Sequence, residues 1–570
     1  MTDPLTADDI ARLEAISAML RAGATGRAIG ALRALTAERP DLAIAHHQLA
    51  AALEAVGDAV GAEPEWRAAL ALDPSLAPAA MKLATRLIGQ RRAGEAVDLL
   101  APFLDTPSAD IHLLTVYGTA LKALNRFGEA ADAYGRAVEA APASGVAEHN
   151  LASVLGDDHR FAESEAATRR AFAKGLDAPE TWLVRGRSLQ GLDKFEEAEE
   201  AFRQAIKRRP AYAPAHVELA QLIWMRTEDF GQACEALDIA LAADPTEAVL
   251  AMGKAKLLEY TGAKSAAYAA LAVPLARRDT DPDLLVTAAL LAMADDPALA
   301  LVHAERAFAV APDSGPVSAA LCQANLALGR ADVAAKIAEA RFQVSPLDQF
   351  PVALAATAWR ILGDPRYRAL YDYDHLVRVQ TIDTPKDWPS LSAFLDDLAP
   401  RLLALQQLRG HPIGQSLRNG AQTAQSLTRS DDPVIKAFFT AIDAPIRAYI
   451  SILKGRDDII GRRAAKAYHF AGAWSVLLRP GGYHVNHLHP MGWISSACHI
   501  TPPAAVERGH EGWLKFGEPG VVTDPPLGPE HFVKPKAGDL VLFPSYMWHG
   551  TVPFGGEEPR LAVAFDVLPG

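Results

Sequence analysis

Cysteine is scarce in this 570-residue chain: there are three, and no two of them stand in a CxxC spacing. This excludes a disulfide-stabilised scaffold and a thiolate zinc site, and it fits a reducing compartment. Positive charge is also in short supply, because the formal net charge is −13. Phosphate binding needs a basic surface, so we expect no nucleic acid as a general partner.

Long apolar runs are missing as well. No stretch of about 18 apolar residues occurs, so we expect no membrane-spanning helix and no membrane partner. The first residues, MTDPLTADDIARLEAIS, lack the basic and then apolar pattern of a signal peptide. We therefore expect a cytoplasmic protein. Half of the residues are hydrophobic and 22% are charged, a globular composition in a chain long enough for two or more domains.

Prolines recur at regular intervals through the first 346 residues. Successive prolines stand 33 to 35 residues apart, or about twice that where weaker boundaries lie near Leu176 and Thr280. A period of 34 is typical of tetratricopeptide repeats, each a helix–turn–helix unit that buries its apolar face against its neighbours. The span holds roughly ten such units. The prolines are Pro40, Pro74, Pro107, Pro142, Pro210, Pro245, Pro312 and Pro346.

The pattern within each unit agrees with this assignment. Large and small residues alternate at the expected positions, because small residues let two helices approach and large ones fill the space between them. An array of this kind predicts a protein or peptide partner in a concave surface; the alternative is a spacer or an oligomerisation arm. The two clearest units carry Leu114, Gly118, Leu121, Ala130, Tyr134 and Ala137, then Trp182, Gly186, Leu189, Ala198, Phe202 and Ala205.

The regular spacing stops after Pro346. Residues 347–460 still look largely helical, with strand-like alternation at HLVRVQTI and an amphipathic helix predicted over 433–454, packed along the outside of the carboxy-terminal domain. The polar segment HPIGQSLRNGAQTAQSLTRSDD is predicted to be a loop; the alternative is that Arg418, Gln422 and Thr423 reach into a site.

From about residue 465 the sequence changes to short β-rich runs separated by glycine and proline. They predict a double-stranded β-helix, or jelly roll. Trp474, Trp493, Trp513 and Trp548 either wall a pocket in it or simply pack its core. The predicted strands are KAYHF, WSVLLRP, GYHVNHLHP, WISSACHITP, GWLKFGE, HFVKP, DLVLFP and RLAVAFDVLP.

Histidines concentrate in this region, with five of the seventeen between residues 484 and 510. Because side chains two apart on a strand share a face, His487 and His489 are expected to point the same way and His484 the opposite way, as a core or surface histidine; the alternative is that a bulge turns His484 inward. His549 follows the strand in GDLVLFPSYMWHG, and Arg560 opens the last strand eleven residues later. His499, His510 and His531 lack a partner at ligand spacing and are expected to be structural.

The runs WSVLLRPGGYHVNHLHPMGWISS, GWLKFGEP, GDLVLFPSYMWHGTVPF and PRLAVAFD resemble bacterial 2-oxoglutarate- and Fe(II)-dependent oxygenases, a group that often carries tetratricopeptide repeats at its amino end. The resemblance implies a dioxygenase that uses Fe(II), 2-oxoglutarate and O2. It implies His487 and His549 as metal ligands, and Arg560 as the residue that binds the far carboxylate of 2-oxoglutarate. Imidazole suits Fe(II), and a guanidinium pairs with a carboxylate through two parallel hydrogen bonds.

His489 stands where many members of that family have the aspartate of an HxD pair. Three interpretations are open: His489 is a third neutral metal and catalytic ligand, it lies behind a two-histidine iron, or the domain has lost activity. The preferred function is oxidation of a polypeptide side chain recruited by the repeats. The alternatives are oxidation of a small metabolite, a non-catalytic repeat scaffold with a degenerate barrel, and a cupin-type metalloenzyme, which the absence of a glutamate shortly after HLH disfavours.

The expected fold class is therefore multidomain, an all-α tetratricopeptide-repeat superhelix followed by a double-stranded β-helix domain with flanking helices. The expected domains are a repeat solenoid over 1–346, a helical connector with barrel-supporting helices over 347–460, and the oxygenase core over 461–570. The oligomeric state does not follow from the sequence.

Overall fold

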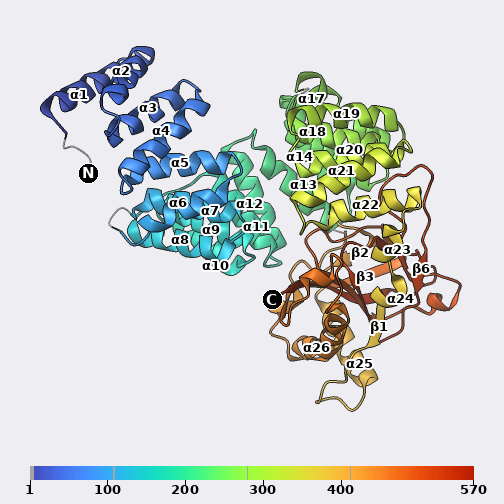
Figure 1. Cartoon of the computed structure of the whole chain (residues 1–570). Coiled ribbons are helices and arrows are strands. Elements are labelled where there is room, and N and C mark those ends of the chain that lie inside the picture. Colours follow the sequence, from blue (N-terminus) through green and yellow to red (C-terminus); the bar gives the residue numbers. More distant parts are fainter. Residues whose placement is uncertain (1–4, 107–108, 279, 411–412) are drawn as a thin grey trace. The chain divides into compact units, whose positions relative to one another are not determined.

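The computed structural model describes residues 5–106, 109–278, 280–410 and 413–570. In these ranges helices α1 to α24 come first, and the strands begin only at β1 (Arg378–Thr381) (Figure 1). The chain forms two compact units, Met1–Leu192 and Asp193–Gly570. Among the described residues, no helix has both the length and the apolar character needed to cross a membrane.

The first unit consists of helices of 8 to 15 residues, and helices that follow one another in sequence pack together. This is the helix–turn–helix arrangement that the period of 34 predicts. The helices are α1 (Ala7–Arg21), α2 (Thr25–Glu38), α3 (Ala43–Ala55), α4 (Ala59–Leu72), α5 (Ala77–Gly89), α6 (Ala93–Leu100), α7 (Ile111–Ala123), α8 (Phe127–Ala140), α9 (Gly145–Asp157), α10 (Phe161–Ala173) and α11 (Pro179–Gln190).

The unit formed by α7 and α8 shows why the small positions are needed. Helix α7 begins after Asp110, whose side chain accepts a hydrogen bond from the Leu113 N–H at 2.9 Å. Gly118 lies against the ring of Tyr134, so that a Cβ atom at Gly118 would stand 3.0 Å from the ring carbons. The close approach of the two helices therefore depends on Gly118. Of the prolines that mark the repeats, Pro107 lies outside the described residues.

Helical repeats continue into the second unit. Its later helices share one apolar core with the β domain. Leu326 and Val352 of these helices belong to the same core as Trp493 and Leu542 of the β domain. The helices are α12 (Phe195–Arg208), α13 (Ala213–Thr227), α14 (Phe230–Ala243), α15 (Ala248–Tyr260), α16 (Lys264–Ala269), α17 (Ala272–Arg277), α18 (Pro282–Ala292), α19 (Pro297–Val310), α20 (Gly315–Ala327), α21 (Ala331–Val344), α22 (Gln349–Leu362), α23 (Arg366–Leu370), α24 (Tyr373–Leu376), α25 (Leu391–Ala404) and α26 (Pro433–Leu453).

Two antiparallel sheets make up the β domain. The larger has the strand order β1-β7-β4-β9-β3-β2 and the smaller the order β6-β5-β8, as a double-stranded β-helix requires. Helical repeats followed by this domain confirm the predicted fold class. Besides β1, the strands are β2 (Leu417–Gln422), β3 (Tyr468–His484), β4 (Ile494–Thr501), β5 (Leu514–Phe516), β6 (His531–Val533), β7 (Asp539–Pro544), β8 (His549–Thr551) and β9 (Arg560–Pro569).

The loop predicted for the polar segment that begins at residue 411 was wrong. Residues 411–412 lie outside the described residues, but 417–422 form β2, which pairs with β3. The backbone groups of β3 on that side need hydrogen-bond partners, and this outweighs the low strand propensity of a polar, glycine-containing segment. The strand predicted over GYHVNHLHP is also shorter than expected, because β3 ends at His484.

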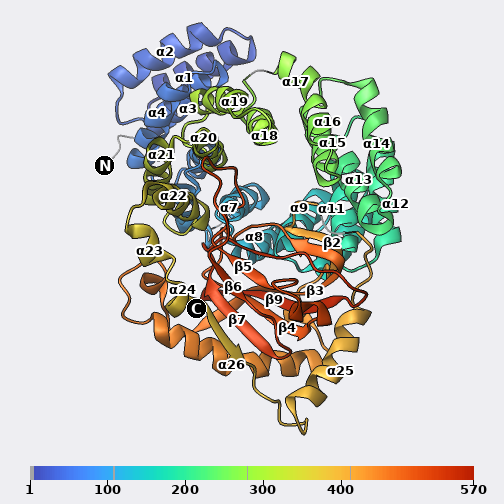
Figure 2. The ribbon, with the colours of Figure 1, turned by 90° about the vertical axis from the view of Figure 1, so that its right-hand side faces the viewer.

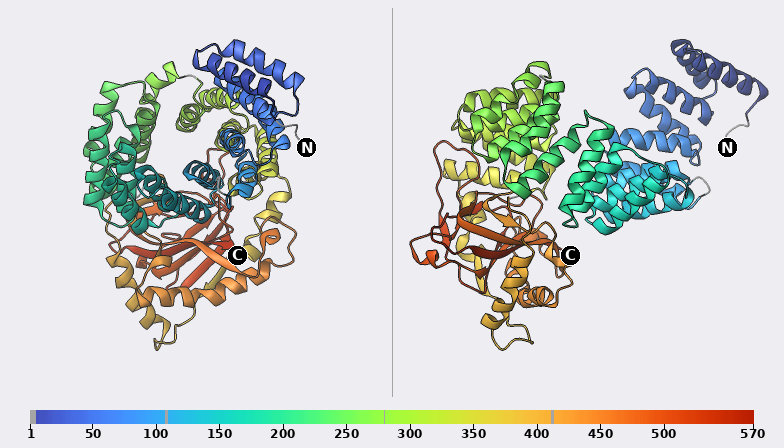
Figure 3. Two further views of the ribbon diagram at one scale, coloured as in Figure 1. Left: turned by 90° about the vertical axis from the view of Figure 1, so that its left-hand side faces the viewer. Right: turned by 180° about the vertical axis from the view of Figure 1, so that it is seen from behind.

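The helix predicted over 433–454 is confirmed as α26. It begins after Asp432, whose carboxylate accepts hydrogen bonds from the Val434 and Ile435 N–H groups. Its apolar face, with Ile442 and Ile446, is buried in the core. The helix itself runs beside the larger sheet (Figure 2). The strand predicted at HLVRVQTI is β1, paired with β7. In the further views of Figure 3 the yellow last repeat helices again adjoin the orange and red β domain.

We expect replacement of Gly118 by leucine to destabilise the repeats by about 1–3 kcal/mol, because the added carbons would overlap the Tyr134 ring. Gly135 on α8 is the matched control, since nothing lies within 4 Å of a Cβ there. Gly135→Leu should leave stability unchanged or raise it by up to about 1 kcal/mol through helix propensity. Urea unfolding followed by circular dichroism measures both; equal stabilities for the two variants would refute the packing argument.

Candidate metal centre

A β-bridge brings two of the predicted metal ligands together. His487 and His549 face each other across antiparallel backbone, with the His487 N–H donating to the His549 carbonyl at 2.8 Å and the His549 N–H donating back at 3.0 Å. Their ring centroids are 4.2 Å apart. The third ring belongs to His489, whose backbone N–H donates to the Ser545 carbonyl at 3.0 Å.

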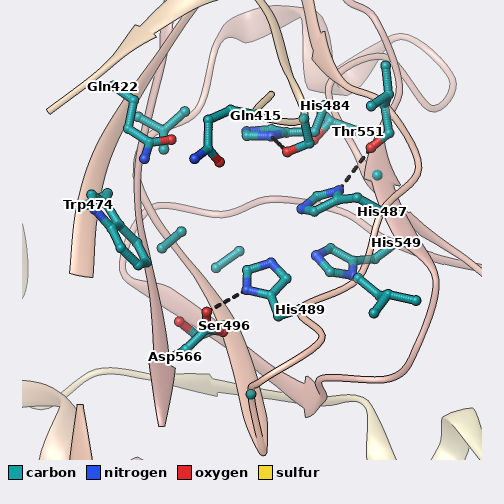
Figure 4. A pocket seen from close by; sticks show the side chains of 18 of the residues that line it. Gln415, Gln422, Trp474, His484, His487, His489, Ser496, His549, Thr551 and Asp566 are labelled. Carbon is teal, nitrogen blue, oxygen red and sulfur yellow. Dashed lines mark hydrogen bonds and ion pairs between the residues drawn. The ribbon is translucent and has the colours of Figure 1, made fainter. Parts of the chain in front are cut away.

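The three imidazoles converge on one point. One ring nitrogen from each of His487, His489 and His549 lies within 4.8 Å of the other two (Figure 4). The other nitrogen, Nδ1, is hydrogen-bonded in every case: to the Val485 carbonyl at 2.9 Å in His487, to the Asp566 carboxylate at 2.5 Å in His489 and to the Met547 carbonyl at 2.9 Å in His549. Because each of these partners only accepts hydrogen bonds, Nδ1 donates and the lone pair remains on Nε2.

Burial keeps two of the rings neutral. It lowers the pKa of His487 to about 3, with a further contribution from His489, and lowers the pKa of His549 well below its usual value. For His489 burial acts in the same direction, but the charge and hydrogen bond of Asp566 outweigh it and raise the pKa. Neutral imidazole is the form that binds a metal, so the site combines two imidazoles whose pKa values are lowered with one whose pKa is raised by Asp566.

The histidines line a cavity of about 770 Å³ between the sheets of the β domain and helix α15. Trp474, Gln415 and Gln422 lie across this cavity from the imidazoles (Figure 4). Helix α15 contributes Lys256, Glu259 and Tyr260. A cavity of this size suits a small ligand together with part of a larger one.

Arg560 is a buried cation in the wall of the same cavity. It opens β9 opposite Leu478 and is 3% exposed. Its Nη2 group donates to His499 Nδ1 at 3.3 Å, while Nε has no hydrogen-bond partner. Burial lowers the pKa of Arg560 to about 10, so the group stays charged at neutral pH. No carboxylate pairs with it among the described residues, and a buried guanidinium without a counter-ion calls for an anionic ligand.

The prediction that His484 faces away from the other histidines was wrong. His484 lines the same cavity, and its ring centroid lies 5.7 Å from that of His487. Residues 485 and 486 leave the strand, so the count of alternating faces does not continue to His487. His484 Nδ1 is hydrogen-bonded to the Ser416 hydroxyl at 2.9 Å.

Several other predicted residues can now be placed. Arg418 and Gln422 line the cavity, and the Arg418 guanidinium stacks over the Tyr260 ring at 4.3 Å. Among the tryptophans, Trp474 lines the cavity, whereas the indole N–H groups of Trp493, Trp513 and Trp548 donate to the Ile460 carbonyl, the Val506 carbonyl and the Thr357 hydroxyl. His499 orients Arg560, and His510 and His531 stack on Phe532 and Tyr373.

Sequence reasoning did not identify Asp566. The signal was nonetheless present, because Asp566 lies six residues after Arg560 on one strand and therefore on the same face. With Arg560 directed into the cavity, a carboxylate at that spacing has to point to the same side. Asp566 indeed lines the cavity.

We expect His487→Ala, His489→Ala and His549→Ala each to lower the affinity for Co(II) by more than about 100-fold. Loss of a group that only supports a ligand costs about 10–100-fold, so His489→Ala distinguishes a ligand from a supporting residue. Calorimetric titration of the metal-free full chain measures this. His510→Ala, stacked on Phe532, is the control. A His489→Ala affinity equal to that of the unmodified chain would rule out the three-histidine site.

Comparison with known proteins bears on both parts of the chain. Residues 472–566 match the family model described as "Putative 2OG-Fe(II) oxygenase", and residues 179–212 match that of the tetratricopeptide repeat. A search of curated proteins found no match.

Among solved structures, the chain is similar to YrrB, described as "a TPR protein with an unusual peptide-binding site", with 21% identity over 32% of this chain and 95% of YrrB and a TM-score of 0.30. It is also similar to yeast Tom70, with 12% identity over 64% and 91% of the two chains and a TM-score of 0.37. A tetratricopeptide repeat protein from Parabacteroides merdae shows 16% identity over 42% and 96%, with a TM-score of 0.33. The chain thus carries tetratricopeptide repeats and, at its carboxy-terminal end, a domain of the 2-oxoglutarate–Fe(II) oxygenase type.

Proposed function

We propose that the protein is an Fe(II)- and 2-oxoglutarate-dependent oxygenase that oxidises a side chain of a polypeptide held by its repeats. One observation carries the proposal: three imidazoles with fixed tautomers converge in a cavity that also contains a buried, uncompensated guanidinium. A metal ion would bind the three imidazoles, and an anion would pair with the guanidinium. A chelating 2-oxo acid would supply that anion next to the metal.

His487, His489 and His549 would hold the iron. Their donor set fits, because each Nδ1 is hydrogen-bonded and each Nε2 faces the other two rings. When bound, Fe(II) supplies the activation of O2, with 2-oxoglutarate as the source of the additional electrons. The chain itself orients the ligands and separates the reacting groups from bulk water, since His549 and Arg560 are both buried.

Arg560 would bind the far carboxylate of 2-oxoglutarate. The guanidinium is held from one side by His499, and its orphaned Nε is available for a second hydrogen bond. The Thr551 hydroxyl, also buried in the cavity wall without a partner, is a further donor for that carboxylate. A barrel retained only as a scaffold has no use for a buried cation of this kind, because its desolvation costs stability without any compensating contact.

The polypeptide substrate is supported by the wall that the repeats contribute. Lys256, Glu259 and Tyr260 belong to the repeat helix α15, and the Tyr260 hydroxyl donates to the Gln415 carbonyl at 3.0 Å beside the cavity. A chain lying on the repeats would therefore reach the histidines directly.

The three cysteines are buried free thiols, in keeping with the proposed cytoplasmic location.

The first test is anaerobic titration of the metal-free full chain with Fe(II) and then with 2-oxoglutarate. We expect the weak visible charge-transfer band of that chelate. Arg560→Ala should weaken 2-oxoglutarate binding by roughly 10- to 150-fold, because a hydrogen bond to a charged group contributes about 1.5–3 kcal/mol.

The control is Arg508→Ala, since Arg508 is an exposed arginine paired with Glu511. Equal 2-oxoglutarate affinity in Arg560→Ala and the unmodified chain would contradict the role of Arg560. Iron binding without the band would favour a cupin-type enzyme that does not use 2-oxoglutarate.

The second test concerns the substrate. In cells that express the protein, mass spectrometry should find polypeptides that gain one oxygen atom, and Arg560→Ala should abolish the gain. Replacing both Lys256 and Glu259 by alanine should lower that oxidation several-fold and leave the charge-transfer band unchanged, because neither residue contacts the histidines. Lys207→Ala on α12 is the control. If only a small metabolite is oxidised, and the α15 variant oxidises it normally, the polypeptide part of the proposal fails.

A further inference from the structure

A buried carboxylate stands directly behind one of the three imidazoles. Asp566 Oδ2 accepts the His489 Nδ1–H at 2.5 Å, and Oδ1 accepts the Ser495 hydroxyl at 2.7 Å. The residue is 8% exposed. Among the described residues, no lysine or arginine pairs with Asp566, and its ion-pair partner is His489. Both carboxylate oxygens are therefore committed, and the negative charge is directed at His489 (Figure 4).

The other two imidazoles are supported differently. His487 and His549 each donate Nδ1–H to the carbonyl of the residue two positions earlier, Val485 and Met547, at 2.9 Å. These acceptors are local and neutral. Only His489 is supported by a charged group, which reaches it from the distant strand β9. The three-histidine set is thus electrostatically asymmetric.

This asymmetry bears on position 489, where this sequence has a histidine in place of the aspartate of an HxD pair. In an HxD pair a carboxylate binds the metal and neutralises one of its two positive charges. Three neutral imidazoles leave both charges uncompensated in a buried site, which is costly. A carboxylate hydrogen-bonded to a metal-bound imidazole restores the balance from one ring further away and strengthens that ring as a donor.

We propose that Asp566 performs, through His489, the charge-balancing role that a directly bound aspartate has elsewhere. The inference rests on the proposed metal site and goes beyond it by assigning Asp566 as its positioning residue. His489 is then the strongest donor of the three ligands, and the HLH sequence is a functional variant of the site.

The surrounding hydrogen bonds hold this pair in a fixed geometry. Asp566 lies opposite Ser495 in the register of β4 and β9. The Ser495 hydroxyl is 2.9 Å from that of Ser545, and the Ser545 carbonyl accepts the His489 N–H at 3.0 Å. One serine pair therefore fixes both the carboxylate and the backbone of the histidine that it supports.

The test is the affinity of the metal-free full chain for Co(II), followed through the visible absorption of the bound ion. We expect Asp566→Asn to lower this affinity by about 10–100-fold and to change the spectrum. Asparagine keeps the size and one acceptor oxygen but removes the charge. Ser495→Ala, which keeps the charge and releases one carboxylate oxygen, should cause a smaller loss. Ser496→Ala is the control: this serine also lines the cavity, but the hydrogen bonds of its hydroxyl within the described residues go to the backbone of Phe565 and not to Asp566.

A double-mutant cycle shows whether Asp566 acts through His489. In a His489→Asp chain the carboxylate binds the metal directly, so adding Asp566→Asn should no longer lower Co(II) affinity. It should leave the affinity unchanged or raise it, because one of two neighbouring negative charges is removed. The melting temperature of each metal-free chain, measured in parallel, separates effects on folding from effects on the metal.

The outcomes are distinct. If the unmodified chain binds Co(II) and Asp566→Asn binds it equally well, the role of Asp566 is refuted while the proposed metal site stands. Asp566→Asn could also lower Co(II) affinity equally in the unmodified and the His489→Asp chains, or lower the melting temperature without lowering the affinity. Either result would give Asp566 a purely structural role and overturn the inference. If the unmodified chain binds no Co(II), the metal site itself fails.

Discussion

The site depends on the two backbone hydrogen bonds between His487 and His549. This short bridge joins the segment after β3 to the start of β8, and it sets the ring centroids 4.2 Å apart. Because each of the two rings also donates to the carbonyl two residues earlier, their Nε2 atoms have little freedom to turn away. In the proposed metal site, this bridge would therefore be the frame that holds two of the ligands in place.

One strand carries two opposite charges on the side that lines the cavity. Strand β9 presents Arg560 at its start and Asp566 six residues later, both on the cavity side. Asp566 has His489 as a partner, whereas the partner that the described part of the chain offers Arg560 is a neutral histidine at 3.3 Å. A buried charge is tolerated when it is paired, so the arrangement leaves a place for an anion near Arg560 and for a cation beyond His489. Under the proposed function, a metal chelated by a dicarboxylic 2-oxo acid would satisfy both places at once.

Much of this could be predicted from local sequence patterns, and the failures share one cause. The period of 34 predicted the helical repeats, and alternation placed His487 beside His489. What was missed depends on partners distant in sequence. The polar residues 417–422 became a strand because β3 offered an open edge, His484 turned inward because β3 ends there, and Asp566 became visible only through its pairing across the barrel. The predicted domain boundaries stay predictions, although the apolar core continues from α20 into the β domain.

Helix α22, which directly follows the predicted repeats, contacts both segments that carry the proposed metal ligands. The Gln349 N–H at the start of α22 donates to the carbonyl of Pro490, the residue after His489. Near the middle of the same helix, the Thr357 hydroxyl accepts the indole N–H of Trp548, the residue before His549, at 3.0 Å. One helix thus braces the neighbours of two proposed ligands on different segments of the barrel.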